Sequence, residues 1–258
     1  MSVDTVTRTD TPDLMISAMA SEIADHDAVL HGVSSPLPIL AMSVARRIHA
    51  PNMAYLSGAE GVDPQVEQIF PSSFDPRQTR GCVAYFGLHE AFDLAQRGEL
   101  QVMFLGAGQI DRHGNTNLSL IGSRDHPKVQ LPGGAATAFL MPITPKVVIW
   151  VARHSPRTFV QEVDFVTGQG YNNRTEEQRR NRLKVVTNLG VMSFDNEDRV
   201  MQLDSVHPGH TMEEVQRQTG FELLIPEGGV RETPLPTPET LAIINELDPE
   251  RVRWSEFR

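Results

Sequence analysis

The sequence predicts an α/β protein with an open, largely parallel sheet and flanking helices, folded as a single domain over residues 1–258. Strand-like and helix-like segments alternate along the chain, and no shift in composition marks an internal boundary. The run from Lys146 to Val151 is the clearest strand. Because its apolar stretch is continuous, it is typical of a strand covered on both faces.

In the first half of the chain, Thr11-Pro12 opens a helix, since proline is favoured at the first helical position. Apolar residues then recur at helical spacing from Ile16 to Ile23. The elements expected to follow are a strand at Ala28–Leu30, a helix from Pro38 to Ile48, a strand from Met53 to Leu56, a helix from His89 to Arg97 stopped by Gly98, and a strand from Leu100 to Leu105.

The second half is expected to contain several short strands and two helices. Thr211 and Glu214 form a capping box that opens a helix reaching Thr219. A last helix begins at Thr237-Pro238 and ends at Asp248. The strands expected after Lys146–Val151 are Val163–Val166, Lys184–Thr187, Val191–Phe194 and Val200–Leu203.

The composition excludes several classes of partner. Lys and Arg number 23 against 33 Asp and Glu, so the formal charge is −10. Such a surface repels phosphate backbones and anionic lipid, and we expect no nucleic-acid and no membrane partner. The most apolar stretch, Phe139–Ala152, contains two prolines and is too short to span a bilayer. The first ten residues lack the pattern of a signal peptide, and a single cysteine, Cys82, excludes an internal disulfide. We expect a cytoplasmic protein.

Two glycine motifs and two polar clusters are candidate binding sites. Gly106-Ala107-Gly108 lacks the third glycine of a dinucleotide fingerprint, yet still allows the backbone to approach a ligand closely. Gly133-Gly134-Ala135 has the composition of a backbone oxyanion site, with a simple turn as the alternative. His207 and His210, separated by Pro-Gly, favour a solvated loop and no metal site. The mixed charges of Gly168–Arg182 also favour a solvated segment, with anion binding as the alternative.

Several segments occur in the order found in a known family. They are Pro38–Arg47 with Ala50-Pro51, Phe104–Asn117, Ser119–Gly122, His126–Lys128, Gly133–Ala135 and Thr219–Phe221. With these the chain resembles, over nearly its whole length, the β subunit of the family I coenzyme A transferases, the glutaconate and 3-oxoacid CoA-transferase group. The motif within Gly106–Asn117 is fairly specific to that family.

The resemblance implies an α subunit of related fold in an α2β2 assembly, with the active site at the interface between the subunits. It implies no cofactor, because coenzyme A enters as part of the substrate. In typical members a β-subunit glutamate before Ser-Gly attacks the acyl-CoA thioester. Here Leu56 stands before Ser57-Gly58, and leucine has no nucleophilic atom. Glu60 is the candidate for a displaced nucleophile, and a surface-loop glutamate is the alternative.

A family fold without the nucleophile resembles the steroid-catabolic branch, whose ring-cleaving hydrolases open the last cholesterol-derived ring as a cyclic CoA thioester. This implies attack by water, a retro-Claisen cleavage and general acid–base groups largely from the α subunit. Two alternatives remain open: a CoA-transferase subunit of the glutaconate or 3-oxoacid type, and a non-catalytic ligand-binding subunit. The residues expected to bind the substrate or its coenzyme A are Ser34, Ser57, Gly106, Gly108, Gln109, Asn115, Gly133, Gly134 and Ala135.

Overall fold

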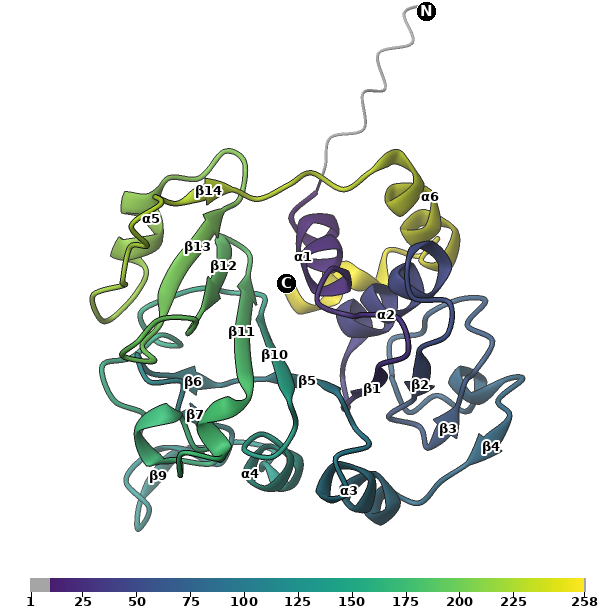
Figure 1. Ribbon diagram of the computed structural model, residues 1–258, viewed down its shortest axis with the longest axis horizontal. Helices are drawn as coiled ribbons and strands as arrows, with labels where there is room; N and C mark the ends of the chain where they lie inside the picture. Colours follow the sequence, from purple (N-terminus) through teal and green to yellow (C-terminus); the bar gives the residue numbers. More distant parts are fainter. Residues whose placement is uncertain (1–9, 258) are drawn as a thin grey trace, which may run out of the picture.

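The computed structural model describes residues 10–257, and a mixed sheet of ten strands forms its centre (Figure 1). The strand order is β14-β13-β12-β11-β10-β5-β1-β2-β3-β4. All neighbours among the five central strands are parallel, which confirms the predicted α/β class. These strands are β11 (Arg182–Thr187), β10 (Lys146–Val151), β5 (Val102–Gly106), β1 (Ala28–His31) and β2 (Ala54–Leu56).

Both edges of the sheet depart from the parallel pattern. At one edge β12 (Gly190–Ser193) and β13 (Gln202–Val206) are antiparallel, and β14 (Arg231–Glu232) adds in parallel. At the other edge β3 (Gly61–Val62) and β4 (Ala84–Tyr85) are antiparallel. Short connections such as the turn between β11 and β12 are compatible only with antiparallel pairing, since a parallel pair requires a long crossover.

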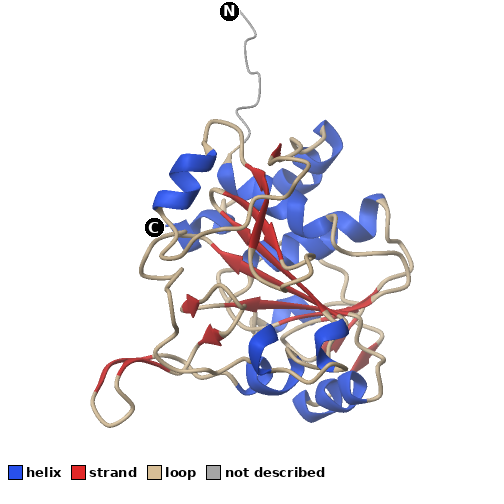
Figure 2. Cartoon of the chain, turned by 60° about the vertical axis from the view of Figure 1, so that its left-hand side comes forward, coloured by secondary structure: helices blue, strands red, loops and turns tan. Residues whose placement is uncertain are grey.

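Helices cover both faces of the sheet, as Figure 2 shows. One face carries α1 (Thr11–Ala20), α2 (Pro36–Ile48), α6 (Pro238–Leu247) and the 3-10 helix η4 (Val252–Phe257). The other carries α3 (Leu88–Gln96), α4 (Ala135–Leu140) and α5 (Met212–Arg217). The smaller elements are η1 (Pro76–Thr79), η2 (Tyr171–Asn173), η3 (Gln178–Arg180), the pair β6 (Gln109–Ile110) and β7 (Thr116–Asn117), and the pair β8 (Leu120–Gly122) and β9 (Pro127–Gln130).

The core consists of two apolar clusters, one on each face of the sheet. Val102 and Phe104 of β5 belong to the cluster under α1 and α2. Met103 and Leu105 of the same strand belong to the cluster under α3 and α4. This alternation explains why the central strands are apolar throughout, since successive side chains point to opposite faces and both faces are covered.

Most predicted elements are confirmed, with shifted ends. β10 has the predicted bounds, whereas α2 begins at Pro36 rather than Pro38. The strand predicted at Val163–Val166 is wrong. A side chain takes the place of a neighbouring strand there: the Asp164 N–H donates to Gln109 Oε1 at 3.0 Å. The elements that were not predicted, α4 and the shortest strands, are too brief for a hydrophobic period to be visible.

Two loops expected to be solvated instead contain buried side chains. His207 is only 1% exposed, and its Nε2 hydrogen-bonds to the Thr187 carbonyl at 2.8 Å. Arg174 is also buried, and its Nε donates to the Gln169 carbonyl at 2.7 Å. The solvated-loop expectation is therefore wrong for these two residues, because local polar partners compensate for the loss of water.

Within residues 10–257, every helix is too short or too polar to cross a membrane. Met1–Thr9, the segment on which the expectation about targeting depends, lies outside the described residues.

Candidate active site

A cavity of about 1030 Å³ opens at the carboxyl ends of the central parallel strands. β1 continues through α2 to β2 on one side, while β5 pairs with the other side of β1. The chain therefore changes its direction of winding between β1 and β5, the position where open α/β sheets bind ligands. The lining includes the segments that follow four strands: Gly32–Ser34, Ser57-Gly58, Ala107-Gly108 and Ala152-Arg153.

This cavity brings together most of the residues that the sequence singled out. Gly108 is required by close packing, because a Cβ there would lie 2.8 Å from Leu131 Cδ1 and 3.0 Å from the Asn117 carbonyl oxygen. The predicted residues that line the cavity are Ser34, Ser57, Glu60, Gly106, Gly108, Gly133, Gly134 and Ala135.

Gln109 and Asn115 do not line the cavity, and their side chains are occupied by internal hydrogen bonds. Gln109 Oε1 accepts from Asn117 Nδ2 at 2.7 Å. Asn115 Nδ2 donates to Asp111 Oδ2 at 2.7 Å, and its Oδ1 accepts from the Gly170 N–H at 2.7 Å. These contacts hold the turn after β5 in shape, so the polar part of the family motif has a structural use here.

The loop after β2 places Glu60 at the rim of the cavity. Leu56 is 4% exposed and packs in the apolar cluster under α3 and α4, and it does not line the cavity. Glu60 is exposed, with a backbone φ of 67°. Its Oε1 accepts from the Leu88 N–H at 3.0 Å, in the first turn of α3. The Glu60 carboxylate thus stabilises a helix start as well as facing the cavity.

His31, which the sequence analysis did not select, joins the loops after β1 and β2. Its Nε2 accepts from the Gly58 N–H at 3.3 Å, and its Nδ1 lies 2.9 Å from the Gly32 carbonyl oxygen. Because a carbonyl can only accept, Nδ1 carries the proton and the ring is neutral. Burial lowers the pKa of His31 to about 4. His31 therefore positions two cavity loops without charge at neutral pH.

The start of α4 supplies free backbone donors. The Gly133 N–H donates to the Leu118 carbonyl at 2.8 Å, with Gly133 at a φ of 95°. The N–H groups of Gly134 and Ala135 have no hydrogen-bond partner within residues 10–257, and both residues line the cavity. Two adjacent free donors can stabilise an oxygen that becomes negatively charged during a reaction.

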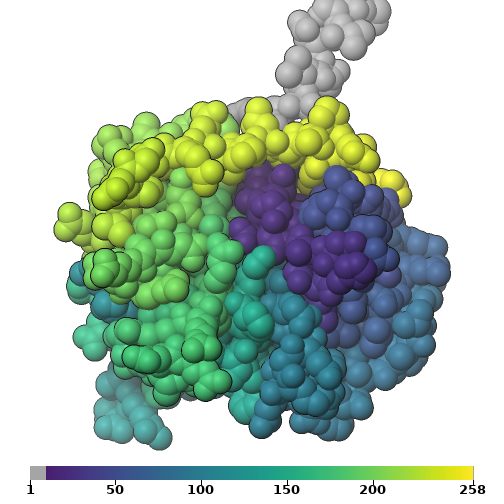
Figure 3. Space-filling model, in the orientation of Figure 1, coloured from purple at the N-terminus to yellow at the C-terminus, as the bar shows by residue number. Residues whose placement is uncertain are grey.

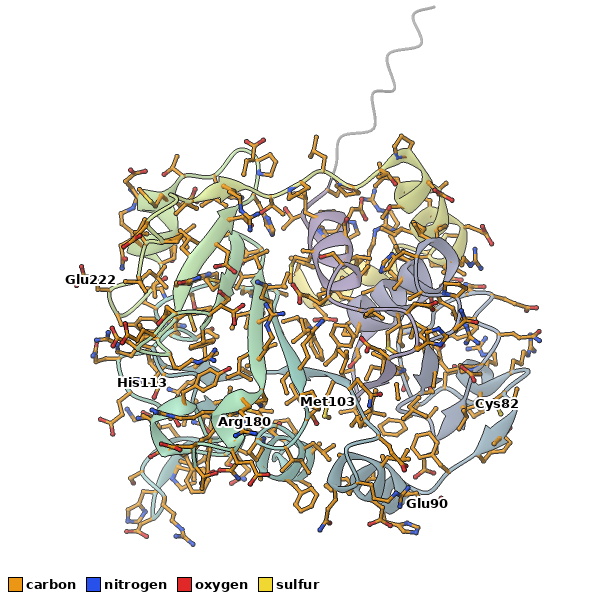
Figure 4. All side chains as sticks on the ribbon, viewed as in Figure 1. Cys82, Glu90, Met103, His113, Arg180 and Glu222 are labelled. Carbon is orange, nitrogen blue, oxygen red and sulfur yellow. The ribbon has the colours of Figure 1, made fainter. Side chains whose placement is uncertain are left out.

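Most of the cavity wall is apolar. Met103 of β5 is part of it and lies near the centre of the molecule in Figure 4, far from Cys82. At the mouth, Val33 and Phe74 are 54% and 53% exposed. The other large apolar residues of the wall are Leu30, Phe86, Leu88, Phe92, Phe104, Leu105, Leu118, Leu140, Trp150 and Val151. Such a wall suits an apolar acyl group more than a charged metabolite.

A second carboxyl group, Glu256 of η4, also lines the cavity, and the sequence analysis missed it. Its Oε2 accepts from the indole Nε1 of Trp150 at 2.7 Å. Burial raises the pKa of Glu256 to about 7, although the hydrogen bond from Trp150 and the nearby Leu37 backbone act in the opposite direction. No motif surrounds Glu256; the available signal was a lone glutamate between aromatic residues near the end of the chain.

Within residues 10–257, His, Cys, Asp and Glu side chains form no group of three or more that could hold an ion.

Comparison with known proteins gives one family and several full-length relatives. The coenzyme A transferase family model matches residues 13–218. The chain is 30% identical over 260 residues to the cholesterol ring-cleaving hydrolase IpdB subunit of Rhodococcus jostii (strain RHA1), covering 98% of each chain. It is 29% identical over 246 residues to a 3-oxoadipate CoA-transferase subunit of Pseudomonas knackmussii, covering 92% of this chain and 93% of that one.

Among solved structures, the decarboxylase AibA/AibB matches with a TM-score of 0.87 and 32% identity, over 96% of this chain and 98% of that chain. The family match spans most of the sequence, and the relatives align along nearly its full length. The protein therefore belongs to the coenzyme A transferase family, as the order of its motifs predicted.

Proposed function

We propose that this chain is the β-type subunit of an α–β enzyme that hydrolyses a carbon–carbon bond in a cyclic acyl-CoA. The proposed substrate is the last ring of a cholesterol-derived skeleton. One observation carries the proposal: the carboxylate expected before Ser57-Gly58 is replaced by Leu56, which is buried in the core, while the cavity retains free backbone donors at Gly134 and Ala135. At this position the chain lacks the nucleophile that covalent carboxylate catalysis needs, but it has the backbone N–H donors that oxyanion stabilisation needs.

The chemistry follows from those donors. Water adds to a ring ketone β to the thioester, and the alkoxide forms next to the N–H groups of Gly134 and Ala135. The C–C bond then breaks, its electron pair moves to the carbon α to the thioester, and the enolate is protonated there. The products are a ring-opened carboxylate and an intact CoA thioester, so no covalent enzyme intermediate forms.

Size and polarity of the cavity support an alicyclic acyl group. A volume of about 1030 Å³ is at the upper end of the range for small-molecule sites, about 300–1,000 Å³. The apolar wall favours transfer of a hydrocarbon ring from water. The relative IpdB is named for cholesterol ring cleavage, which supports the same substrate class for this chain.

An α subunit is the proposed partner. The matched structures are two-component proteins by name, AibA/AibB and IpdAB. Next to the cavity, β4 and the start of α3 expose apolar side chains: Val83, Tyr85 and Leu88 are 74%, 72% and 59% exposed. Contiguous exposed apolar surface is typical of a protein interface, and covering it would also close the cavity mouth.

A CoA-transferase subunit remains the second candidate function, because Glu60 lines the cavity and carries a carboxylate. In that case Glu60 attacks the thioester and coenzyme A passes to an acceptor acid.

The test uses this chain purified in complex with its α subunit. A cyclic β-keto acyl-CoA is supplied in oxygen-18 water, and the products are analysed by mass spectrometry. We expect one labelled oxygen in the new carboxylate and none in the thioester. Transfer of coenzyme A to added acetate or succinate would favour the transferase, and release of carbon dioxide from a carboxylated acyl-CoA would favour a decarboxylase. The isolated chain, lacking half of the interface, should be inactive.

A further inference from the structure

Glu256 lines the cavity, and the Trp150 indole is the hydrogen-bond partner of its carboxyl group among the described residues. Oε2 accepts from the Trp150 indole at 2.7 Å. Oε1 is buried and has no hydrogen-bond partner within residues 10–257. Leaving a buried polar atom without a partner is unfavourable, so such an atom calls for an explanation. A rotation of the carboxyl group toward the cavity that Glu256 lines would present this oxygen to a substrate or water proton.

The segment that carries Glu256 is fixed from inside the fold. Arg253 is 3% exposed, and its Nε lies 2.9 Å from Asp13 Oδ1. Its Nη1 donates to Asp248 Oδ2 at 2.9 Å, which joins η4 to the end of α6. In Figure 3 the stretch that leads into α6, in yellow, lies next to α1, in purple, so the element that precedes η4 packs on the N-terminal helix. Glu256 is thus held against the end of β10.

Neighbouring charges do not determine how Glu256 titrates. Its pKa reflects burial, opposed by the hydrogen bond from Trp150 and by the nearby Leu37 backbone. Among the groups that face the cavity from other elements, His31 is neutral and Glu60 is at the exposed rim. Arg153, also exposed, uses its Nη2 to donate to the Phe257 carbonyl at 3.1 Å. A group that titrates near neutral pH can act as both base and acid.

We propose that Glu256 is the proton-transfer group that this chain contributes to the reaction in the cavity, an inference that depends on the proposed function. As a carboxylate it takes a proton from water while the water oxygen bonds to the ring ketone. When the C–C bond breaks and its electron pair moves to the α carbon, Glu256 returns that proton to the α carbon. Glu256 is then again a carboxylate, and no other reactant is consumed.

The first experiment compares variants of the α–β complex. Glu256→Gln keeps the shape and the contact with the indole but cannot transfer the proton, so kcat should fall about 10²–10⁴-fold. Glu256→Asp should recover part of it. Glu250→Gln, an exposed glutamate near the same end of the chain, is the matched control and should change kcat less than twofold. An unchanged kcat in Glu256→Gln would overturn the inference.

The second experiment uses the pH profile, which a purely structural role would not move. The profile of kcat/KM should show an inflection near 7 that disappears in Glu256→Gln. Trp150→Phe removes a hydrogen bond to the ionised carboxylate, so the inflection should move to higher pH. An inflection that stays in place in both variants would assign it to another group and contradict the proposal.

A third measurement separates failure of this inference from failure of the proposed function. Exchange of the α hydrogen of a ring-opened acyl-CoA with solvent deuterium requires proton transfer but no C–C cleavage. If the complex cleaves no ring substrate yet catalyses an exchange that Glu256→Gln abolishes, the proposed function fails and the role of Glu256 stands. If cleavage proceeds normally in Glu256→Gln, the proposed function stands and the role of Glu256 fails.

Discussion

Glu60 and Glu256 reach the same cavity from distant parts of the chain, and their surroundings differ. Glu60 is exposed at the rim, with Oε1 occupied by the Leu88 N–H. Glu256 lies deeper, beside the Trp150 indole, with Oε1 buried and unpaired in the described chain. Glu60 is close to the position of the family nucleophile in sequence, whereas Glu256 has the environment of a reactive carboxyl group. Surroundings, more than proximity to a motif, determine which carboxylate can react.

The largest expected effect tests whether η4 is needed to hold Glu256 in place. Arg253→Met leaves the buried carboxyl groups of Asp13 and Asp248 without their cation, which should lower the free energy of unfolding by about 3–5 kcal/mol. Denaturant unfolding of the complex measures it. The control is Arg47→Met, which breaks the exposed pair with Glu246 and should cost about 1 kcal/mol or less. Equal losses in both variants would show that η4 is not anchored by this pair.

The next effect concerns the backbone N–H groups of Gly134 and Ala135, which line the same cavity as Glu60 and Glu256. Gly134→Val should lower turnover about 10²–10³-fold, because it displaces one N–H from the oxyanion position. Stability should fall too, since a Cβ at Gly134 would lie 2.1 Å from Thr167 Cγ2. In the double variant Gly134→Ala with Thr167→Ser the clashing methyl is absent, and both quantities should recover. Without that recovery, the Thr167 contact does not explain why glycine is needed.

The sequence was sufficient for the class and the centre of the fold. The apolar run Lys146–Val151 and the Thr11-Pro12 helix start are local signals, and the structure has both elements where they were predicted. The antiparallel edges were not predicted because strands such as Gly61–Val62 are too short to show alternation. Their pairing depends on contacts with distant strands.

The candidate site could be predicted where a glycine or a loop lies at the end of a strand. Gly108 and Gly134 belong to recognisable motifs, and both line the cavity. Glu256 and His31 could not be selected, since their properties come from burial against residues far along the chain. Gln109 and Asn115 belong to the family motif, and in the structure their side chains hold a turn, so their contact with substrate stays a prediction.

The pH dependence of stability separates Glu256 from the buried histidines by sign. Burial raises the pKa of Glu256 from 4.5 to about 7, so its contribution to stability is lost as pH rises through this interval. Burial lowers the pKa of His154 to about 3 and that of His207 to about 4. The contribution of these two histidines to stability is therefore lost as the pH falls below 6.5.

Thermal unfolding between pH 4 and 8 measures both effects. Relative to the unmodified chain, Glu256→Gln should gain stability above pH 7, where the buried carboxylate would otherwise be charged. His207→Gln should instead reduce the loss of stability on the acid side. If Glu256→Gln changed stability equally at every pH, the Glu256 carboxyl would not titrate in the folded protein as described.

The smallest effect is expected at Glu60. If water is the nucleophile, Glu60→Ala removes only the hydrogen bond to the Leu88 N–H, costing roughly 0.5–2 kcal/mol of stability as at other helix starts. Turnover should stay within a few-fold, with any change in KM rather than kcat. Mass spectrometry of the substrate-treated complex should then find no coenzyme A adduct on the peptide that contains Glu60. An adduct there, together with loss of turnover in both Glu60→Ala and Glu60→Asp, would reverse the comparison. The exposed carboxylate would then be the nucleophile of a CoA-transferase, and Glu256 would have no proton to move for C–C cleavage.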